Sequence, residues 1–279
     1  MLPVGAPAVA SRLVLQPSAQ KLNASEKLKR DREVLLEAVK KNGRELEHAS
    51  EELKGDKGVV MEAVKQAGSS LQYASEELRG DREVVMEAVK QRGWALKYAS
   101  KELKGDREVV MEAVKNGFPL TDVIIKLKRD REVVMEAVKQ AGSSLQYASE
   151  ELKGNREVVM EAVKQAGSSL QYASEELKGD KGVVMEAVKQ SGLALRLVAS
   201  EELKGDREVV LEAVKRDGCA LQYASEELKG DREVVKEAVK QNEGALEHAS
   251  EELKGDRDVM LEAVRTAFIM QSKAARNVR

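Results

Sequence analysis

The sequence predicts an all-α fold, a right-handed type of α-solenoid built from about ten short two-helix repeats. A stretch that is seen in nearly pure form from Ser149 to Ala173 recurs along almost the whole chain. Self-similarity at a fixed period of about 20–50 residues is typical of solenoid proteins. The residue after each Lys-Gly-like pair marks the register, in steps of 25 residues with one step of 24 and one of 26. These register positions are Asp31, Asp56, Asp81, Asp106, Asp130, Asn155, Asp180, Asp206, Asp231 and Asp256.

The first half of each repeat has the signals of an amphipathic helix. In the second repeat, Asp56 is the expected N-cap, because its carboxylate can accept hydrogen bonds from the free N–H groups of the first turn. Gly68 is expected to end this helix as a left-handed C-cap. The apolar residues in between lie at helical spacing on one face, at Val59, Val60, Ala63 and Val64.

The second half predicts a shorter helix, from about Ser70 to Arg79, which Gly80 ends. Its apolar face holds Leu71, Ala74 and Leu78. An alternative is a mixed solenoid in which this segment is a 3₁₀ turn, although Ala-Ser-Glu-Glu-Leu favours an α-helix. No segment alternates with a period of two, so strands are not expected. Helices this short are unstable alone, and stacking must stabilise them.

Composition limits the function classes. Charged residues make up 34% of the chain and aromatic residues 3%, as in helical repeat proteins rather than enzymes with a deep aromatic pocket. The net charge of −2 argues against a nucleic-acid partner. No apolar run is long enough to cross a membrane. The single cysteine, Cys219, excludes an internal disulfide.

The two ends differ from the repeats. Residues 1–21 lack acidic side chains and predict an extended N-terminal arm that docks on a partner; the alternative is the edge of an organelle-targeting segment. The solenoid is expected over residues 22–267, with a half-repeat cap at 22–30 and ten repeats from residue 31. Residues 268–279 predict a C-terminal helical extension, which either closes the array or binds a partner.

Three units break the pattern. The fourth is one residue short and reads KNGFPLTDVIIKLKR, with Ile124 and Ile125 in place of Ser-Glu. The seventh gains a residue, and the ninth carries its glycine one position late. The residues that deviate are the expected partner contacts, together with two on the C-terminal extension: Trp94, Phe118, Pro119, Leu193, Lys236, Phe268 and Ile269.

Two ladders of side chains recur along the array. One is the Met/Leu position, for example Met61 and Met86, and the other is a ring position, for example Tyr73 and Tyr98, which His48 and His248 occupy elsewhere. Both ladders can be packing residues between layers. Alternatively, they form an adaptable binding face, because Met repacks easily and Tyr makes good contacts.

Nothing in the sequence predicts catalysis. Adjacent glutamates such as Glu76 and Glu77 point in different directions on a helix and do not form a carboxylate pair. No phosphate-binding loop, His-Glu-x-x-His or EF-hand pattern is present. Cys219 follows a turn glycine at a position that varies freely between units. We therefore expect a non-enzyme without cofactor or metal.

One unit, with Leu71, Tyr73, Ala74, Ser75, Leu78, Asp81, Val84, Val85, Ala88 and Val89, carries a resemblance to a known family. The units resemble domain of unknown function 4116, short helical repeats that occur in tandem in protist, algal and some bacterial proteins. The resemblance covers Leu22 to roughly Ala267 and implies a repeat fold without an established activity. The compartment stays open, and a soluble protein in an organelle of an alga or protist is one option.

The leading hypothesis for function is a non-catalytic scaffold that mediates protein–protein interactions, as a subunit of or linker in a larger assembly. The alternative is a free adaptor that binds short peptides along a concave Met/Tyr face. The expected partners are other proteins. Nucleic acid and a transmembrane segment are not expected, and association with a membrane through a partner is left open.

Overall fold

The computed structural model describes residues 31–277, with side chains to Ser272. The predicted arm (1–21) and half-repeat cap (22–30) therefore lie outside the described residues. The chain divides into two compact units, Met1–Leu103 and Lys104–Arg279, and each is described by itself. The described residues of both units form helices and no strand.

From residue 31 onward, unit 1 holds three long helices and their connecting short segments. The long helices are α2 (Arg32–Lys41), α4 (Lys57–Gln66) and α6 (Arg82–Gln91). The 3₁₀ helices are η1 (Gly43–His48), η2 (Gly68–Tyr73) and η3 (Gly93–Tyr98), and the short α-helices are α3 (Glu51–Lys54) and α5 (Glu76–Arg79). The 3₁₀ helix η4 (Leu103–Gly105) begins at the last residue of this unit.

Unit 2 repeats the same arrangement. Its long helices are α7 (Arg107–Lys115), α8 (Arg131–Gln140), α10 (Arg156–Gln165), α12 (Lys181–Gln190), α14 (Arg207–Arg216), α16 (Arg232–Gln241) and α18 (Arg257–Asn277). The 3₁₀ helices are η5 (Leu120–Asp122), η6 (Leu127–Arg129), η7 (Gly142–Tyr147), η8 (Gly167–Tyr172), η9 (Gly192–Leu197), η10 (Gly218–Tyr223) and η11 (Glu243–His248). The short α-helices are α9 (Glu150–Lys153), α11 (Glu175–Lys178), α13 (Glu201–Lys204), α15 (Glu226–Lys229) and α17 (Glu251–Lys254).

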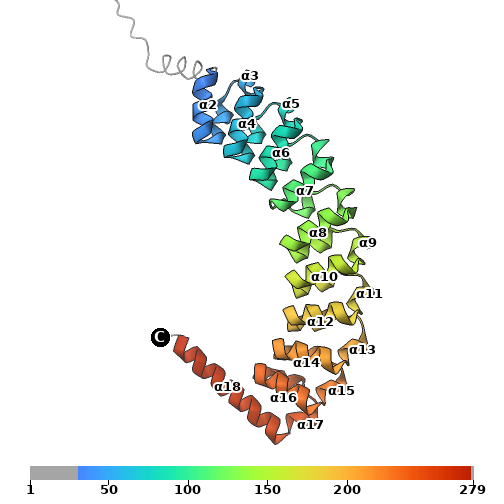
Figure 1. Ribbon diagram of the computed structural model, residues 1–279. Coiled ribbons are helices and arrows are strands. Elements are labelled where there is room, and N and C mark those ends of the chain that lie inside the picture. The colour runs from blue at the N-terminus through green and yellow to red at the C-terminus, as the bar shows by residue number, and fades with distance from the viewer. Residues whose placement is uncertain (1–30, 278–279) are drawn as a thin grey trace, which may run out of the picture. The chain divides into compact units, whose positions relative to one another are not determined.

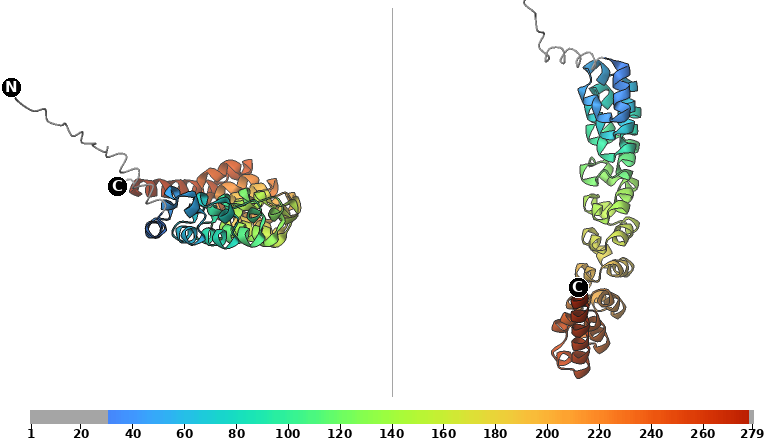
Figure 2. Two further views of the ribbon diagram at one scale, coloured as in Figure 1. Left: turned by 90° about the horizontal axis from the view of Figure 1, so that it is seen from above. Right: turned by 90° about the vertical axis from the view of Figure 1, so that its left-hand side faces the viewer.

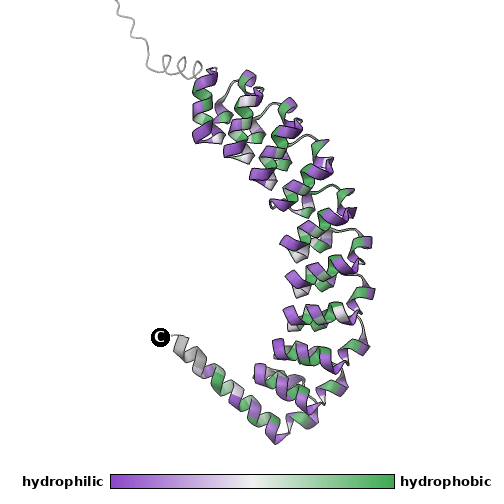
Figure 3. Cartoon of the chain, in the orientation of Figure 1, coloured by the Kyte–Doolittle hydropathy of each residue, from purple (hydrophilic) through white to green (hydrophobic). Residues whose placement is uncertain are grey.

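Within unit 2 the long helices stack side by side from α8 to α16, and the short helices run along the other side of the stack (Figure 1). A view turned by 90° shows the same two rows (Figure 2). Hydrophobic residues lie where neighbouring layers meet, and hydrophilic residues cover the outer sides (Figure 3). The predicted stripe Val59, Val60, Ala63 and Val64 is fully buried, and its equivalents in the interior repeats are buried as well. The tandem stacking of helices that the sequence predicts is confirmed.

The second half of the repeat is not the single helix that was expected from Ser70 to Arg79. Gly68–Tyr73 is a 3₁₀ helix, Ala74 and Ser75 are extended, and one α-helical turn follows at Glu76–Arg79. Two contacts impose the break: the N–H of Ser75 donates to the carbonyl of Lys54 in the preceding repeat at 2.9 Å, and the Ser75 hydroxyl caps the turn at Leu78. The 3₁₀ alternative therefore describes the first part of this segment.

The N-cap prediction is confirmed, because the Asp56 side chain accepts from the N–H of Val59 at 2.9 Å. The prediction for Gly68 is wrong. The helix ends in extended backbone at Ala67, with φ −149°, and Gly68 is not left-handed. Glycine is needed because a Cβ at Gly68 would collide with the carbonyl oxygen of Ala88 in the next long helix. Close approach between layers is the reason for this glycine.

Among the residues the structure describes, no helix is long and apolar enough to cross a membrane.

Candidate interaction surfaces

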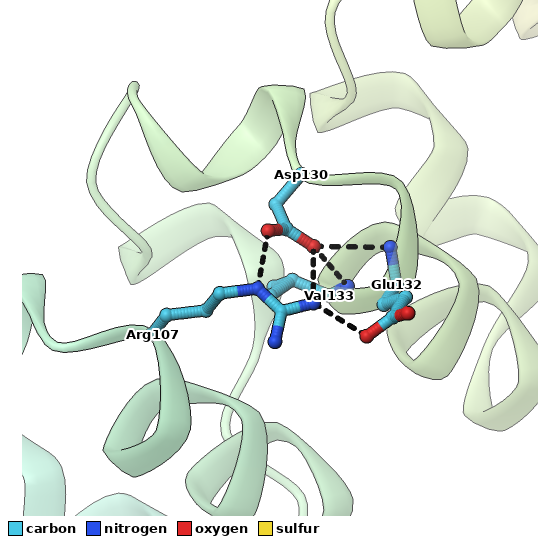
Figure 4. Close-up of polar contacts among 4 residues, drawn as sticks. All are labelled: Arg107, Asp130, Glu132 and Val133. Carbon is cyan, nitrogen blue, oxygen red and sulfur yellow. Dashed lines mark hydrogen bonds and ion pairs between the residues drawn. The ribbon is translucent and has the colours of Figure 1, made fainter.

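A ladder of ion pairs joins successive repeats. Arg107, at the start of α7, donates from Nε to Asp130 Oδ2 at 2.6 Å and also pairs with Glu132 (Figure 4). Asp130 also accepts from the N–H groups of Glu132 and Val133 in the first turn of α8. Burial raises the pKa of Asp130, but Arg107 and the backbone donors outweigh it, so that the pKa lies below its usual value.

The same pairs recur in both units, at Arg32–Asp56, Lys57–Asp81, Arg156–Asp180, Lys181–Asp206, Arg207–Asp231 and Arg232–Asp256. Where Asn155 replaces the carboxylate, Arg131 pairs with Glu157 instead. The cations are about half exposed and screened by solvent, so each pair alone stabilises the fold only weakly. The repeated Arg and Asp are thus accounted for as positions that link layers.

The turn of the fourth repeat (residues 106–129) differs from the turns of the other repeats. Gly117 is the one glycine with positive φ in the described part of the chain, at 85°, and it follows the C-cap Asn116. The N–H of Phe118 returns to the carbonyl of Ala113 at 2.9 Å, which closes the end of α7. Phe118 is only 5% exposed, so its ring is buried and is not presented as a contact. Pro119 is half-buried as the N-cap of η5.

The fourth repeat also exposes two isoleucines. Ile124 and Ile125 replace the Ser-Glu that begins the short helix elsewhere, and Leu127–Arg129 is a 3₁₀ helix instead. Lys101, which also replaces the first glutamate, likewise precedes a 3₁₀ segment. A carboxylate in the first turn stabilises an α-helix. Both of these repeats lack the first of the two glutamates that regular repeats carry there. Ile125 is 77% exposed, although sequence reasoning did not select it as a contact.

A pocket of about 430 Å³ lies beside Ile125. Its wall includes Lys128 and Tyr147, and the Lys128 ammonium lies 5.9 Å from the centre of the Tyr147 ring. Two glutamates, Glu150 and Glu151, line the same pocket. An exposed apolar side chain, an aromatic ring and charges of both signs are therefore gathered at one place.

Three other predicted contacts are not among the residues that line this pocket. Trp94 and Leu193 are exposed on η3 and η9, at the second position of each 3₁₀ helix. Lys236 lies half-buried on α16. Within unit 2, Leu193 and Lys236 lie on different elements, η9 and α16.

The C-terminal helix α18 carries the largest group of exposed apolar side chains in unit 2. Phe268 is 73% exposed, and Ile269 is exposed beside it. Both belong to the helix that the sequence predicted for this end. Four further exposed residues were not selected: Met260, Leu261, Val264 and Met270. Val264 could have been found, because no repeat sequence follows it to cover the position.

The two ladders lie on different elements. The methionines belong to the long helices, where Met61 and Met86 line a depression of about 510 Å³ together with charged side chains. The tyrosines belong to the 3₁₀ row, where the Tyr73 hydroxyl donates to Glu47, and this bond raises the pKa of Tyr73. None of the described pockets combines the two residue types.

The single cysteine, Cys219, contacts a neighbouring side chain, and possible metal ligands are not clustered in the described residues. Asn242 Nδ2 donates to Cys219 Sγ at 3.1 Å, and burial raises the pKa of the Cys219 thiol. In the described residues, no group of three or more His, Cys, Asp or Glu side chains could hold a metal ion.

A family model described as Domain of unknown function (DUF4116) matches nearly all of this array. The matches cover residues 22–54, 56–104, 81–128, 106–153, 130–178, 155–199, 180–229 and 231–270. The chain belongs to the DUF4116 family. In this member, a regular DUF4116 repeat folds as a long α-helix, a 3₁₀ helix and one α-helical turn. No curated protein and no solved structure matches the chain.

Proposed function

We propose that this DUF4116 protein is a non-catalytic scaffold that binds other proteins, as a subunit of or linker in a larger assembly. The regular repeats set the spacing, and the places where the repeat is broken form the contacts. The surface around Ile125, with Lys128 and Tyr147, is the proposed main contact.

One observation supports this proposal above the rest. Large apolar side chains are exposed at the ends or breaks of the array, while the regular units keep theirs buried or half-buried. There are two exceptions in otherwise regular repeats: Trp94 is exposed on η3, and Tyr147 borders the pocket beside Ile125. Exposed apolar groups rimmed by charge are typical of protein-binding sites.

The free-adaptor alternative has less support. A peptide face made of both ladders needs Met and Tyr side chains on one surface, and they belong to separate rows of elements. The Met61 depression is walled mainly by charged groups. We therefore favour the scaffold.

Cross-linking mass spectrometry on the chain purified gently from its native source tests the proposal. Lys126 and Lys128 follow Ile125 closely in the sequence, and Lys153 and Lys178 occupy the position of Lys128 in regular repeats. We expect cross-links to other proteins from the first pair and few from the second. An even spread over all four lysines, or none to any other protein, would contradict the assignment.

A further inference from the structure

The two end helices of the described array leave opposite halves of one repeated interface uncovered. In an interior helix such as α4, four apolar positions are fully buried: Val59, Val60, Ala63 and Val64. In α2 the second and fourth equivalents, Leu35 and Val39, are buried, while Val34 is 40% exposed and Ala38 is half-buried. These are the first and third positions of the set.

At the other end the pattern is reversed. In α18 the first and third positions, Val259 and Ala263, are buried, while Met260 is exposed and Val264 is 67% exposed. The first and third positions thus face the preceding layer, and the second and fourth face the following one. After Val264 the chain lacks the glycine turn and the Ala-Ser-Glu-Glu-Leu pattern, and α18 runs on to Asn277.

The charges at the two ends are complementary in the same register. Inside the array, Arg232 reaches forward to Asp256 at 3.2 Å and to Asp258 at 2.6 Å. The next cation in this ladder is Arg257, on α18. The first carboxylates of the ladder are Asp31, the N-cap of α2, and Glu33 in the first turn of α2. No ion pair joins any of these three end residues to another residue in the described range.

The 3₁₀ row ends in the same way. Leu246 in η11 is half-buried, although its equivalent Leu221 is fully buried. A pocket of about 570 Å³ is open there, lined by Leu246, Glu247 and Lys254 among others. In interior layers this place is filled by the next short segment. There the backbone N–H of a serine donates to a lysine carbonyl, as the N–H of Ser250 does to the carbonyl of Lys229 at 2.9 Å. Residues 22–30, LNASEKLKR, have the sequence of such a segment.

We infer that the chain binds a second copy of itself head to tail: Val34 and Ala38 of one molecule pack on Met260 and Val264 of another, with Arg257 paired to Asp31 and Glu33. The contact continues the interface that already joins neighbouring repeats within each unit. It goes beyond the proposed function, because its partner is the same chain and its surface excludes Ile125. A head-to-tail contact is heterologous, so it extends beyond a dimer.

Sedimentation velocity on the full chain, from about 1 to 200 µM, tests this inference in the range of weak protein interfaces. The wild type should form concentration-dependent species larger than a dimer. Val34→Asp and Val264→Asp should each be monomeric, because a carboxylate would be buried in the contact. Mixed together, the two variants retain one good head and one good tail, and they should form dimers and nothing larger.

Charge reversal provides a second set of variants at exposed positions. Arg257→Glu should weaken association at least about tenfold. A partner that carries Asp31→Lys and Glu33→Lys should restore it. Ile125→Glu is the control, and it should leave self-association unchanged. Failure of the self-association inference is therefore distinguishable from failure of the proposed function.

Three results would overturn the inference. The first is a wild-type chain that stays monomeric over the whole range. The second is loss of association in Val264→Asp but not in Val34→Asp, which would indicate that α18 pairs with itself. The third is a mixture of the two variants that stays monomeric while circular dichroism shows both to be folded, which would assign these faces to a different protein.

Discussion

At the scale of single residues, two glycines of unit 2 have opposite roles. A Cβ at Gly167, in the turn after α10, would collide with the backbone carbonyl of Ala187 in the next layer. Gly182 lies inside α12, and a Cβ there meets Arg156 Nη2 at 2.6 Å, the end of a flexible side chain. The first glycine is required by packing, and the second is a weak point in a helix.

Gly167→Ala should therefore destabilise the protein by about 1–3 kcal/mol, since the backbone of the next layer must shift. Gly182→Ala should stabilise it by up to about 1 kcal/mol, because alanine favours the helix and the displaced ion pair is exposed. Urea unfolding followed by circular dichroism measures both. Equal effects of the two changes would show that the layers do not approach as closely as described.

At the scale of one element, the N-cap aspartate couples each long helix to the layer before it. Lys181 lies 2.7 Å from Asp206 and lowers the pKa of Asp206; burial opposes this shift, and the N–H groups of Val209 and Glu208 support it. In the unfolded chain an aspartate titrates near pH 4. The unfolded chain therefore binds this proton at higher pH than the folded chain does. Stability that is present above about pH 4 is lost as pH falls through the lower folded pKa.

Asp206→Asn tests this coupling, because asparagine keeps the cap and removes the charge, as Asn155 does naturally. The variant should lose less stability than the wild type between neutral pH and about pH 3.5. Urea midpoints at the two pH values give the comparison, with Glu175→Gln, at an exposed helix position, as the control. An unchanged pH dependence would mean that Asp206 contributes no acid sensitivity.

The elements also show what sequence reasoning could and could not find. The register, the Asp56 cap and the valine stripes follow from local patterns and were predicted. The break at Ala74 and Ser75 was missed, because helix propensity favours a helix there and a hydrogen bond from the preceding repeat overrides it. The role of Gly68 and the burial of Phe118 depend on neighbouring layers, which no local pattern reveals.

At the scale of the whole molecule, the repeats supply many nearly identical layers, and function is expected where a layer differs. Most partner-contact candidates are residues that deviate from the repeat, and that rule selects exposed Trp94 and Leu193 along with buried Phe118. It passed over Ile125, the most exposed of the large hydrophobic residues described. Exposure is thus the additional information that the structure supplies.

Ile125→Glu tests the central claim most directly, since it installs the residue that regular units carry at this position and removes the exposed side chain. Quantitative affinity purification of tagged wild type and variant from the native source is the measurement, with Glu175→Gln as the matched control in a regular unit. We expect the variant to lose its bound proteins while helicity and thermal stability stay at or above wild type. Recovery of the same proteins in the same amounts would contradict the assignment of this surface.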